Sequence, residues 1–147
     1  MYTHLFVPID GSELSERTFV QSVGLASKLG ARITGFVAEP LPPLPTESSV
    51  MSAYLRQAED HRQRTEAHAQ ATLDRFAAHA AAAGVPFEGC FKRSDTVDNT
   101  IVATAVEHGC DLLVMATHGR GALGEFLFGS HTKSVISRST LPVLVLH

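Results

Sequence analysis

The sequence predicts a single α/β domain, with five parallel strands in one sheet and helices on both of its faces. Short apolar runs alternate with helical patterns five times along the 147 residues, and such alternation is typical of parallel sheets joined by right-handed crossovers. The length suits one domain with a substantial core. In an open sheet of this kind, ligands bind outside the carboxyl ends of the strands, where the strand order reverses.

The N-terminal elements are a strand, a helix and a second strand. The apolar run Leu5–Val7 predicts the first strand, which ends in the turn Pro8–Ser12. Ser12 is a suitable N-cap because its hydroxyl can accept a hydrogen bond from a free backbone N–H of the first turn. Apolar residues then recur at helical spacing until Gly30, which is suited to end the helix. The β-branched residues within Ala31–Ala38 predict the second strand.

A proline-rich loop and one long helix follow. Glu39–Pro45 carries four prolines in seven residues and is therefore a surface loop. Ser49–Ala83 contains neither proline nor glycine and is rich in helix-forming residues, which favours one long helix, with a break near its start as the alternative. Its apolar stripe is thin between Leu55 and Leu73, so the middle of this helix is expected to be mostly solvated.

The next elements lead to a fourth strand. Phe87–Phe91 predicts a weaker third strand, and Ser94 or Asp95 is expected to cap the helix after it. Gly109 ends that helix. The apolar run Leu112–Ala116 is then typical of a strand that is buried on both faces.

A glycine-rich loop connects the fourth strand to a last helix and strand. Ser130 is expected to cap the helix that opens after Gly129, and Pro142–Leu146 predicts the fifth strand. The free N–H groups and the positive dipole end of the helix favour an anion in the loop. A phosphate group is the natural candidate.

Composition and charge exclude several classes of protein. The net charge of −3 does not indicate a surface for nucleic acid or for anionic membranes. No apolar stretch approaches the roughly 18 residues that a membrane span needs. Cys90 and Cys110 lack metal or redox spacing, and with no secretory signal they indicate a reducing cytoplasm. His118 alone is no metal site, and no metal-ligand spacing is found among His61, His68, His79 and His108.

Two familiar phosphate-binding motifs fit the glycine-rich loop poorly. Gly119, Gly121 and Gly124 match the dinucleotide pattern, but the acidic residue expected about 20 positions later is missing. Gly124–Ser130 has the spacing of a P-loop, but a serine stands where the lysine should be. Neither motif is therefore favoured.

A third pattern fits the whole chain. Ala116-x2-Gly119-x9-Gly129-Ser130 resembles the G-x2-G-x9-G-(S/T) loop of the universal stress protein family, with alanine in place of the first glycine. Val7–Ser12 resembles the first strand and turn of that family, and Ser139–Val145 resembles its closing segment. The resemblance covers residues 1–147 and implies one universal stress protein domain.

The resemblance implies a Rossmann-like α/β sandwich of the adenine nucleotide alpha hydrolase-like type that binds ATP, ADP or AMP, with Mg²⁺ or Mn²⁺ as a possible companion of the phosphates. In this sequence Asp10 and its neighbours would contact adenine and ribose, and Val37 would line the adenine pocket. Residues from the end of the fourth strand and from the loop and helix start after it would contact ribose and phosphates. Arg120 can either reach the phosphates or stay in solvent. The implied binding residues are Pro8, Ile9, Asp10, Val37, Met115, Ala116, Gly119, Arg120, Gly129, Ser130, His131 and Thr132.

The resemblance also implies a homodimer, because the family pairs its last strand with that of a second copy. Here that strand is the apolar run Val143–Leu146, which suits a sheet edge. The expected role is that of a cytoplasmic regulatory protein in stress response. An alternative is a dimeric interaction module of the same fold that binds no nucleotide. No nucleophile and base stand at a readable spacing, so slow ATP hydrolysis or autophosphorylation is left open.

Overall fold

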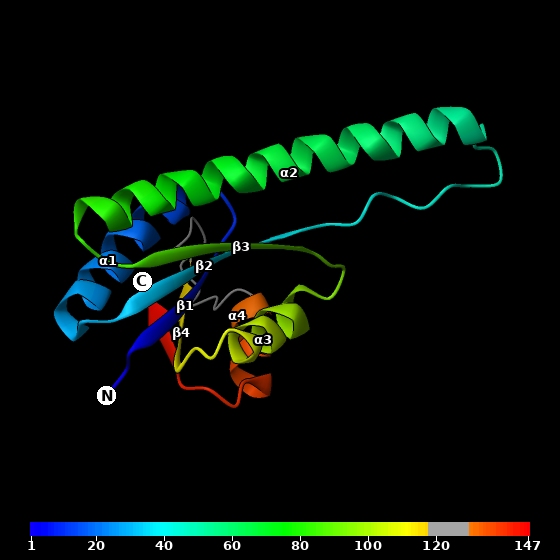
Figure 1. The fold of residues 1–147 in the computed structure, drawn as a ribbon. Helices are drawn as coiled ribbons and strands as arrows, with labels where there is room; N and C mark the ends of the chain where they lie inside the picture. The colour runs from blue at the N-terminus through cyan, green and yellow to red at the C-terminus, as the bar shows by residue number, and fades with distance from the viewer. Residues whose placement is uncertain (118–129) are drawn as a thin grey trace.

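The protein forms one five-stranded parallel sheet with a helix after each of the first four strands (Figure 1). The computed structural model describes residues 1–117 and 130–147. Its strands are β1 (His4–Ile9), β2 (Arg32–Glu39), β3 (Phe87–Arg93), β4 (Leu112–Ala116) and β5 (Val143–Leu146). Its helices are α1 (Glu13–Leu29), α2 (Met51–Ala82), α3 (Val97–Glu107) and α4 (Ser130–Arg138). The predicted fold class is confirmed.

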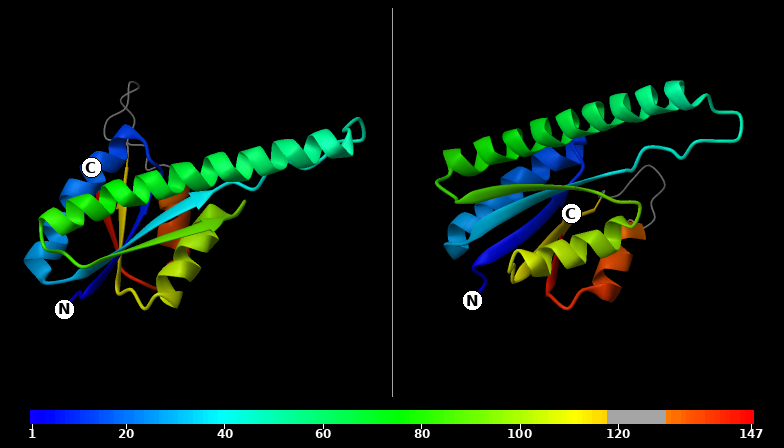
Figure 2. Two further views of the ribbon diagram at one scale, coloured as in Figure 1. Left: turned by 45° about the horizontal axis from the view of Figure 1, so that its top comes forward. Right: turned by 45° about the vertical axis from the view of Figure 1, so that its right-hand side comes forward.

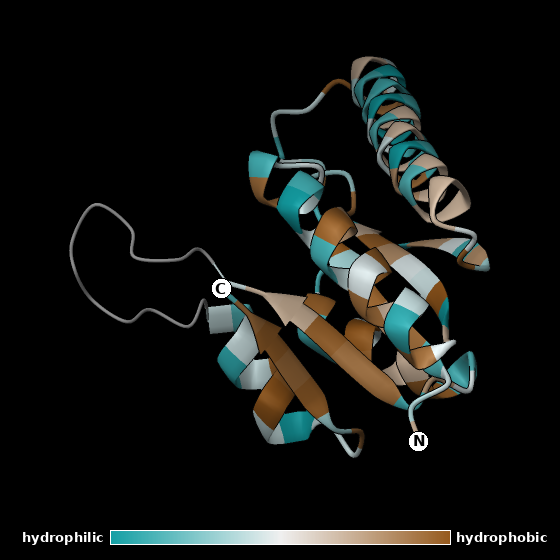
Figure 3. Cartoon of the chain, turned by 90° about the vertical axis from the view of Figure 1, so that its left-hand side faces the viewer, coloured by the Kyte–Doolittle hydropathy of each residue, from teal (hydrophilic) through white to brown (hydrophobic). Residues whose placement is uncertain are grey.

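The sheet separates two apolar layers. Successive side chains of a strand point to opposite faces, so Leu5 and Val7 join the core under α1 and α2, whereas Phe6 joins the core under α3 and α4. The two helix pairs lie on opposite sides of the sheet (Figures 1 and 2). Hydrophobic residues dominate the central strands because both faces are covered (Figure 3).

The strand order reverses beside β1. The order across the sheet is β3-β2-β1-β4-β5, so the chain builds outward from β1 first in one direction and then in the other. The loops that leave β1 and β4 therefore diverge to opposite faces of the sheet. This divergence leaves an opening at the carboxyl ends of the two strands, and β5 occupies the sheet edge, as predicted.

Helix α2 is longer than the sheet that it covers. It has 32 residues, and all of its buried residues lie at or beyond Ala69. Its N-terminal part extends past the sheet beside the proline-rich loop (Figures 1 and 2). The expected solvation of the middle of this helix is confirmed.

Three predicted helix caps differ in detail from the structure. Thr96, rather than Ser94 or Asp95, is the N-cap of α3, because the hydroxyl of Ser94 accepts the Thr96 N–H in a turn ahead of the helix. Ser130 lies within α4 and therefore does not hold the N-cap position. Ser12 is the N-cap of α1 as predicted, but its side chain makes no capping hydrogen bond.

The two cysteines are free thiols. Cys110 is buried, and this burial raises its pKa to about 11, so its thiol stays protonated. Within residues 1–117 and 130–147, no helix has the length and apolar character to cross a membrane.

Candidate functional site

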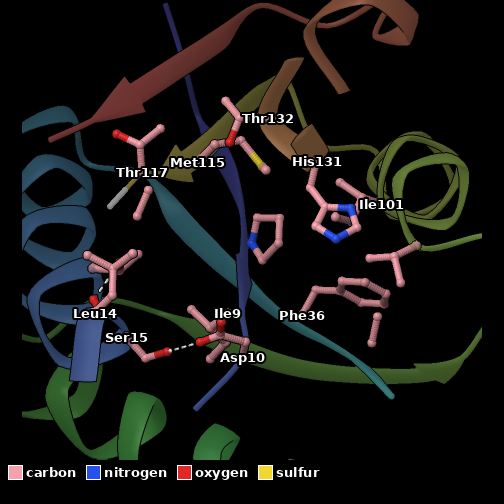
Figure 4. A pocket seen from close by; sticks show the side chains of 15 residues that line it. Ile9, Asp10, Leu14, Ser15, Phe36, Ile101, Met115, Thr117, His131 and Thr132 are labelled. Atoms are coloured by element: carbon pink, nitrogen blue, oxygen red, sulfur yellow. Dashed lines mark hydrogen bonds between the residues drawn. The ribbon is translucent and has the colours of Figure 1, made fainter. Parts of the chain in front are cut away.

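A cavity of about 330 Å³ opens at the carboxyl ends of β1 and β4, where the strand order reverses (Figure 4). Its lining comes from β1, β2, β4, α1, α3 and α4 and from the loops beside them. The lining residues are Pro8, Ile9, Asp10, Leu14, Ser15, Thr18, Phe36, Ala38, Val97, Ile101, Met115, Ala116, Thr117, His131 and Thr132. One side of this set is apolar, whereas the other carries hydroxyl groups and a carboxylate.

The polar side begins with the loop between β1 and α1. Asp10 Oδ1 accepts a hydrogen bond from the Ser12 N–H at 2.9 Å. It accepts a second one from the Ser15 hydroxyl at 3.1 Å (Figure 4). Ser15 Oγ in turn accepts the Gly11 N–H at 3.0 Å. Gly11 has φ of +80°, which only glycine adopts without strain. These bonds fix the Asp10 carboxylate at the rim of the cavity.

The first turn of α4 supplies another part of the lining. Thr132 is 3% exposed, and His131 lies beside it in the helix. The imidazole Nδ1 of His131 is 2.6 Å from Oδ1 of Asp98 in α3, so the pair joins the two helices at the cavity. The N–H groups of a first helical turn and the helix dipole favour an anion.

The apolar side is a wall of β2 and α3 side chains. Phe36 and Ala38 come from β2, and Val97 and Ile101 come from α3. The Phe36 ring is backed by Phe6, with ring centroids 5.3 Å apart. Such a wall accepts an uncharged aromatic ring, because apolar contact requires no directed partner.

The structure brings together seven of the predicted binding residues, namely Pro8, Ile9, Asp10, Met115, Ala116, His131 and Thr132. Val37 is placed elsewhere: it is fully buried in the core on the α1 and α2 face. Its strand neighbours Phe36 and Ala38 line the cavity instead, because side chains alternate across a strand. Ser130 is exposed and is not part of the lining. Gly119, Arg120 and Gly129 lie outside the described residues.

Eight lining residues were not predicted: Leu14, Ser15, Thr18, Phe36, Ala38, Val97, Ile101 and Thr117. Helical spacing could have found Ser15 and Thr18, since residues near the start of a helix that follows β1 share the edge on which Asp10 lies. Strand alternation could have found Phe36 and Ala38. Neither helical spacing nor strand alternation depends on a recognisable motif.

No metal centre is formed by the described part of the chain. Residues 1–117 and 130–147 contain no group of three or more histidine, cysteine, aspartate or glutamate side chains that could hold a metal ion. His118 lies outside the described residues.

Comparisons with known proteins agree with the fold. The profile of the universal stress protein family matches residues 1–147. A universal stress protein of Thermus aquaticus is 28% identical over 147 residues, which cover 99% of each chain.

Two solved structures share the fold. A Methanocaldococcus jannaschii universal stress protein aligns with a TM-score of 0.75 and 23% identity, over 99% of this chain and 96% of that one. A universal stress protein in complex with cAMP aligns with a TM-score of 0.69 and 24% identity, over 99% and 97% of the two chains. The chain described above belongs to the universal stress protein family.

Proposed function

We propose that this protein binds an adenine nucleotide in the cavity at the ends of β1 and β4. The observation that carries the proposal is the pairing within one cavity of an apolar wall with Asp10 and the first turn of α4. A nucleotide has the matching parts, namely a flat uncharged base, a ribose with hydroxyl groups and an anionic phosphate. The similar structure solved with cAMP supports this choice of ligand class.

The chemistry of the lining suggests how the nucleotide lies. The base stacks against the wall formed by Phe36 and Ile101, and the Asp10 carboxylate accepts hydrogen bonds from the ribose or the base. The phosphates face the first turn of α4, where Thr132 lies. The proposal extends to the glycine-rich loop, with Gly119, Arg120, Gly129 and Ser130 around the phosphates and with Mg²⁺ or Mn²⁺ as their counter-ion.

Calorimetric titration tests the proposal. Protein that has been unfolded, freed of bound nucleotide and refolded is titrated with ATP, AMP and cAMP. Thr132→Val keeps the side-chain shape and removes one hydroxyl donor. A hydrogen bond to a charged group is worth about 1.5–3 kcal/mol, so we expect roughly 10- to 150-fold weaker binding of the preferred nucleotide.

Ser137→Ala is the matched control for this titration. It removes a hydroxyl from the same helix, but Ser137 is exposed, bonds to the carbonyl of Ser134 and does not line the cavity. Its affinity should equal that of the wild type. Absence of binding by the wild type at millimolar ATP, AMP and cAMP would sink the proposal and would favour a nucleotide-free interaction module.

The proposed regulatory role combines the nucleotide site with a dimer. Two copies would pair through the open edge of β5, and nucleotide occupancy would shift the population of states that a partner protein recognises in stress response. The two free thiols agree with a cytoplasmic protein.

A further inference from the structure

We infer that His68 of α2 is a positioning residue for the nucleotide site, and that it acts through the loop that carries Asp10. His68 does not line the cavity. It nevertheless contacts the loop between β1 and α1 from the opposite side and is itself held by Glu39. This inference rests on the proposed function.

The imidazole of His68 lies directly against Gly11. A Cβ atom built on Gly11 would be 2.5 Å from His68 Nε2 and 2.8 Å from the hydroxyl of Thr72. A Cβ atom cannot lie that close to a nitrogen or oxygen atom unless one of the groups moves. The imidazole therefore occupies the space that a side chain at position 11 would need. Gly11 thus permits both the positive φ of the loop and its close contact with α2.

Glu39 fixes the orientation of the imidazole. It lies at the carboxyl end of β2, is 8% exposed, and places Oε1 at 2.7 Å from His68 Nδ1. A carboxylate only accepts hydrogen bonds, so Nδ1 donates and Nε2 faces the loop. Because Glu39 belongs to the rigid sheet, the ring is held in one position although half of its side-chain surface is exposed.

The contact at Gly11 reaches Asp10 through hydrogen bonds of the loop. The Gly11 N–H donates to Ser15 Oγ, whose hydroxyl donates to Asp10 Oδ1. The Ser12 N–H donates to the same carboxylate oxygen. A shift of the Gly11 backbone therefore moves two donors that help to orient the Asp10 carboxylate toward the cavity.

His79 offers a matched control on the same helix. It also pairs with a glutamate, with Nε2 at 3.2 Å from Glu16 Oε2, and its side chain is 40% exposed against 50% for His68. Its ring packs on Phe19 rather than on the loop. Any general effect of removing a histidine–glutamate pair from α2 appears in His79→Ala as well.

The first test is a double-mutant cycle on nucleotide affinity. In His68→Ala the Asp10 side chain is no longer held in its binding orientation, which is expected to weaken nucleotide binding roughly two- to tenfold. His79→Ala should bind the nucleotide like the wild type. In an Asp10→Asn background, His68→Ala should have no further effect, because its influence passes through Asp10. Additive effects of the two substitutions would overturn the inference.

The second test uses the free protein and needs no ligand. Amide hydrogen exchange of the Ser12 N–H reports the bond to Asp10. We expect faster exchange in His68→Ala and unchanged exchange in His79→Ala. Wild-type exchange and wild-type affinity in His68→Ala would refute the inference and leave the proposed function standing. Faster exchange in a protein that binds no nucleotide would show that His68 supports the loop only structurally, and both proposals would fail.

Discussion

Two leucines of α2 provide a sharp test of how the helix is divided into a packed part and an extended part. Leu55 and Leu73 are 18 positions apart in the sequence, and five turns of helix at 3.6 residues each also take 18 residues. The two side chains therefore leave the helix in the same direction. Leu73 is 5% exposed, whereas Leu55 is 58% exposed, because the sheet ends between them.

The same substitution should have very different costs at the two positions. Leu73 belongs to the core of the α1 and α2 face and lies in contact distance of Gly89, whose added Cβ would be 3.4 Å from Leu73 Cδ1. Burial of this degree predicts that Leu73→Ala lowers the free energy of unfolding by about 2.7–5 kcal/mol. Leu55→Ala should change it by no more than about 0.5 kcal/mol.

Urea unfolding followed by far-UV circular dichroism measures both values. A domain of this type has a total free energy of unfolding of about 5–15 kcal/mol, so the cost of Leu73→Ala is a large and measurable fraction. The slope of the free energy of unfolding against urea concentration should equal that of the wild type. A cost below about 1 kcal/mol for Leu73→Ala, or equal costs for the two variants, would refute the described packing of α2.

Two further predictions concern pH and assembly. Burial and then the charge of Arg32 lower the pKa of His4, whose Nε2 is 2.8 Å from the Thr34 hydroxyl. The unfolded chain then binds the proton more readily, so the free energy of unfolding should fall as the pH drops below about 6.5, by at most about 1.4 kcal/mol per pH unit. Urea unfolding between pH 5 and 7 measures this pH dependence. The same pH dependence in the wild type and in His4→Gln would contradict the prediction. For the dimer, the carbonyl of Pro142 accepts the N–H of Leu113 in β4, and that of Leu146 accepts the N–H of Thr117 just after β4. This pattern leaves the backbone of Val145 directed to the open edge. Val145→Pro should therefore halve the mass measured by sedimentation without unfolding the chain, and a wild-type monomer would remove the dimer from the proposed function.

The sequence was sufficient for the fold because its signals are local. Apart from β3, each strand contains a short apolar run, and Gly30 and Gly109 end helices where predicted, so element order and a parallel sheet followed. Asp10 after β1 and Thr117 after β4 fell on one sheet edge for the same reason. The cap of α3 was misplaced because Ser94 and Thr96 both suit a turn, and only the hydrogen bond between them decides the choice.

The contribution of β2 was harder to predict because it depends on the parity of the strand. The sequence-based expectation places Val37 in the cavity, but a shift of one residue along a strand moves every side chain to the opposite face. In the structure Phe36 and Ala38 face the cavity, whereas Val37 and Glu39 face α2. The same alternation that removes Val37 from the cavity brings the Glu39 carboxylate to His68. One strand end thus supplies the apolar wall on one face and, on the other, the support for the loop that presents Asp10.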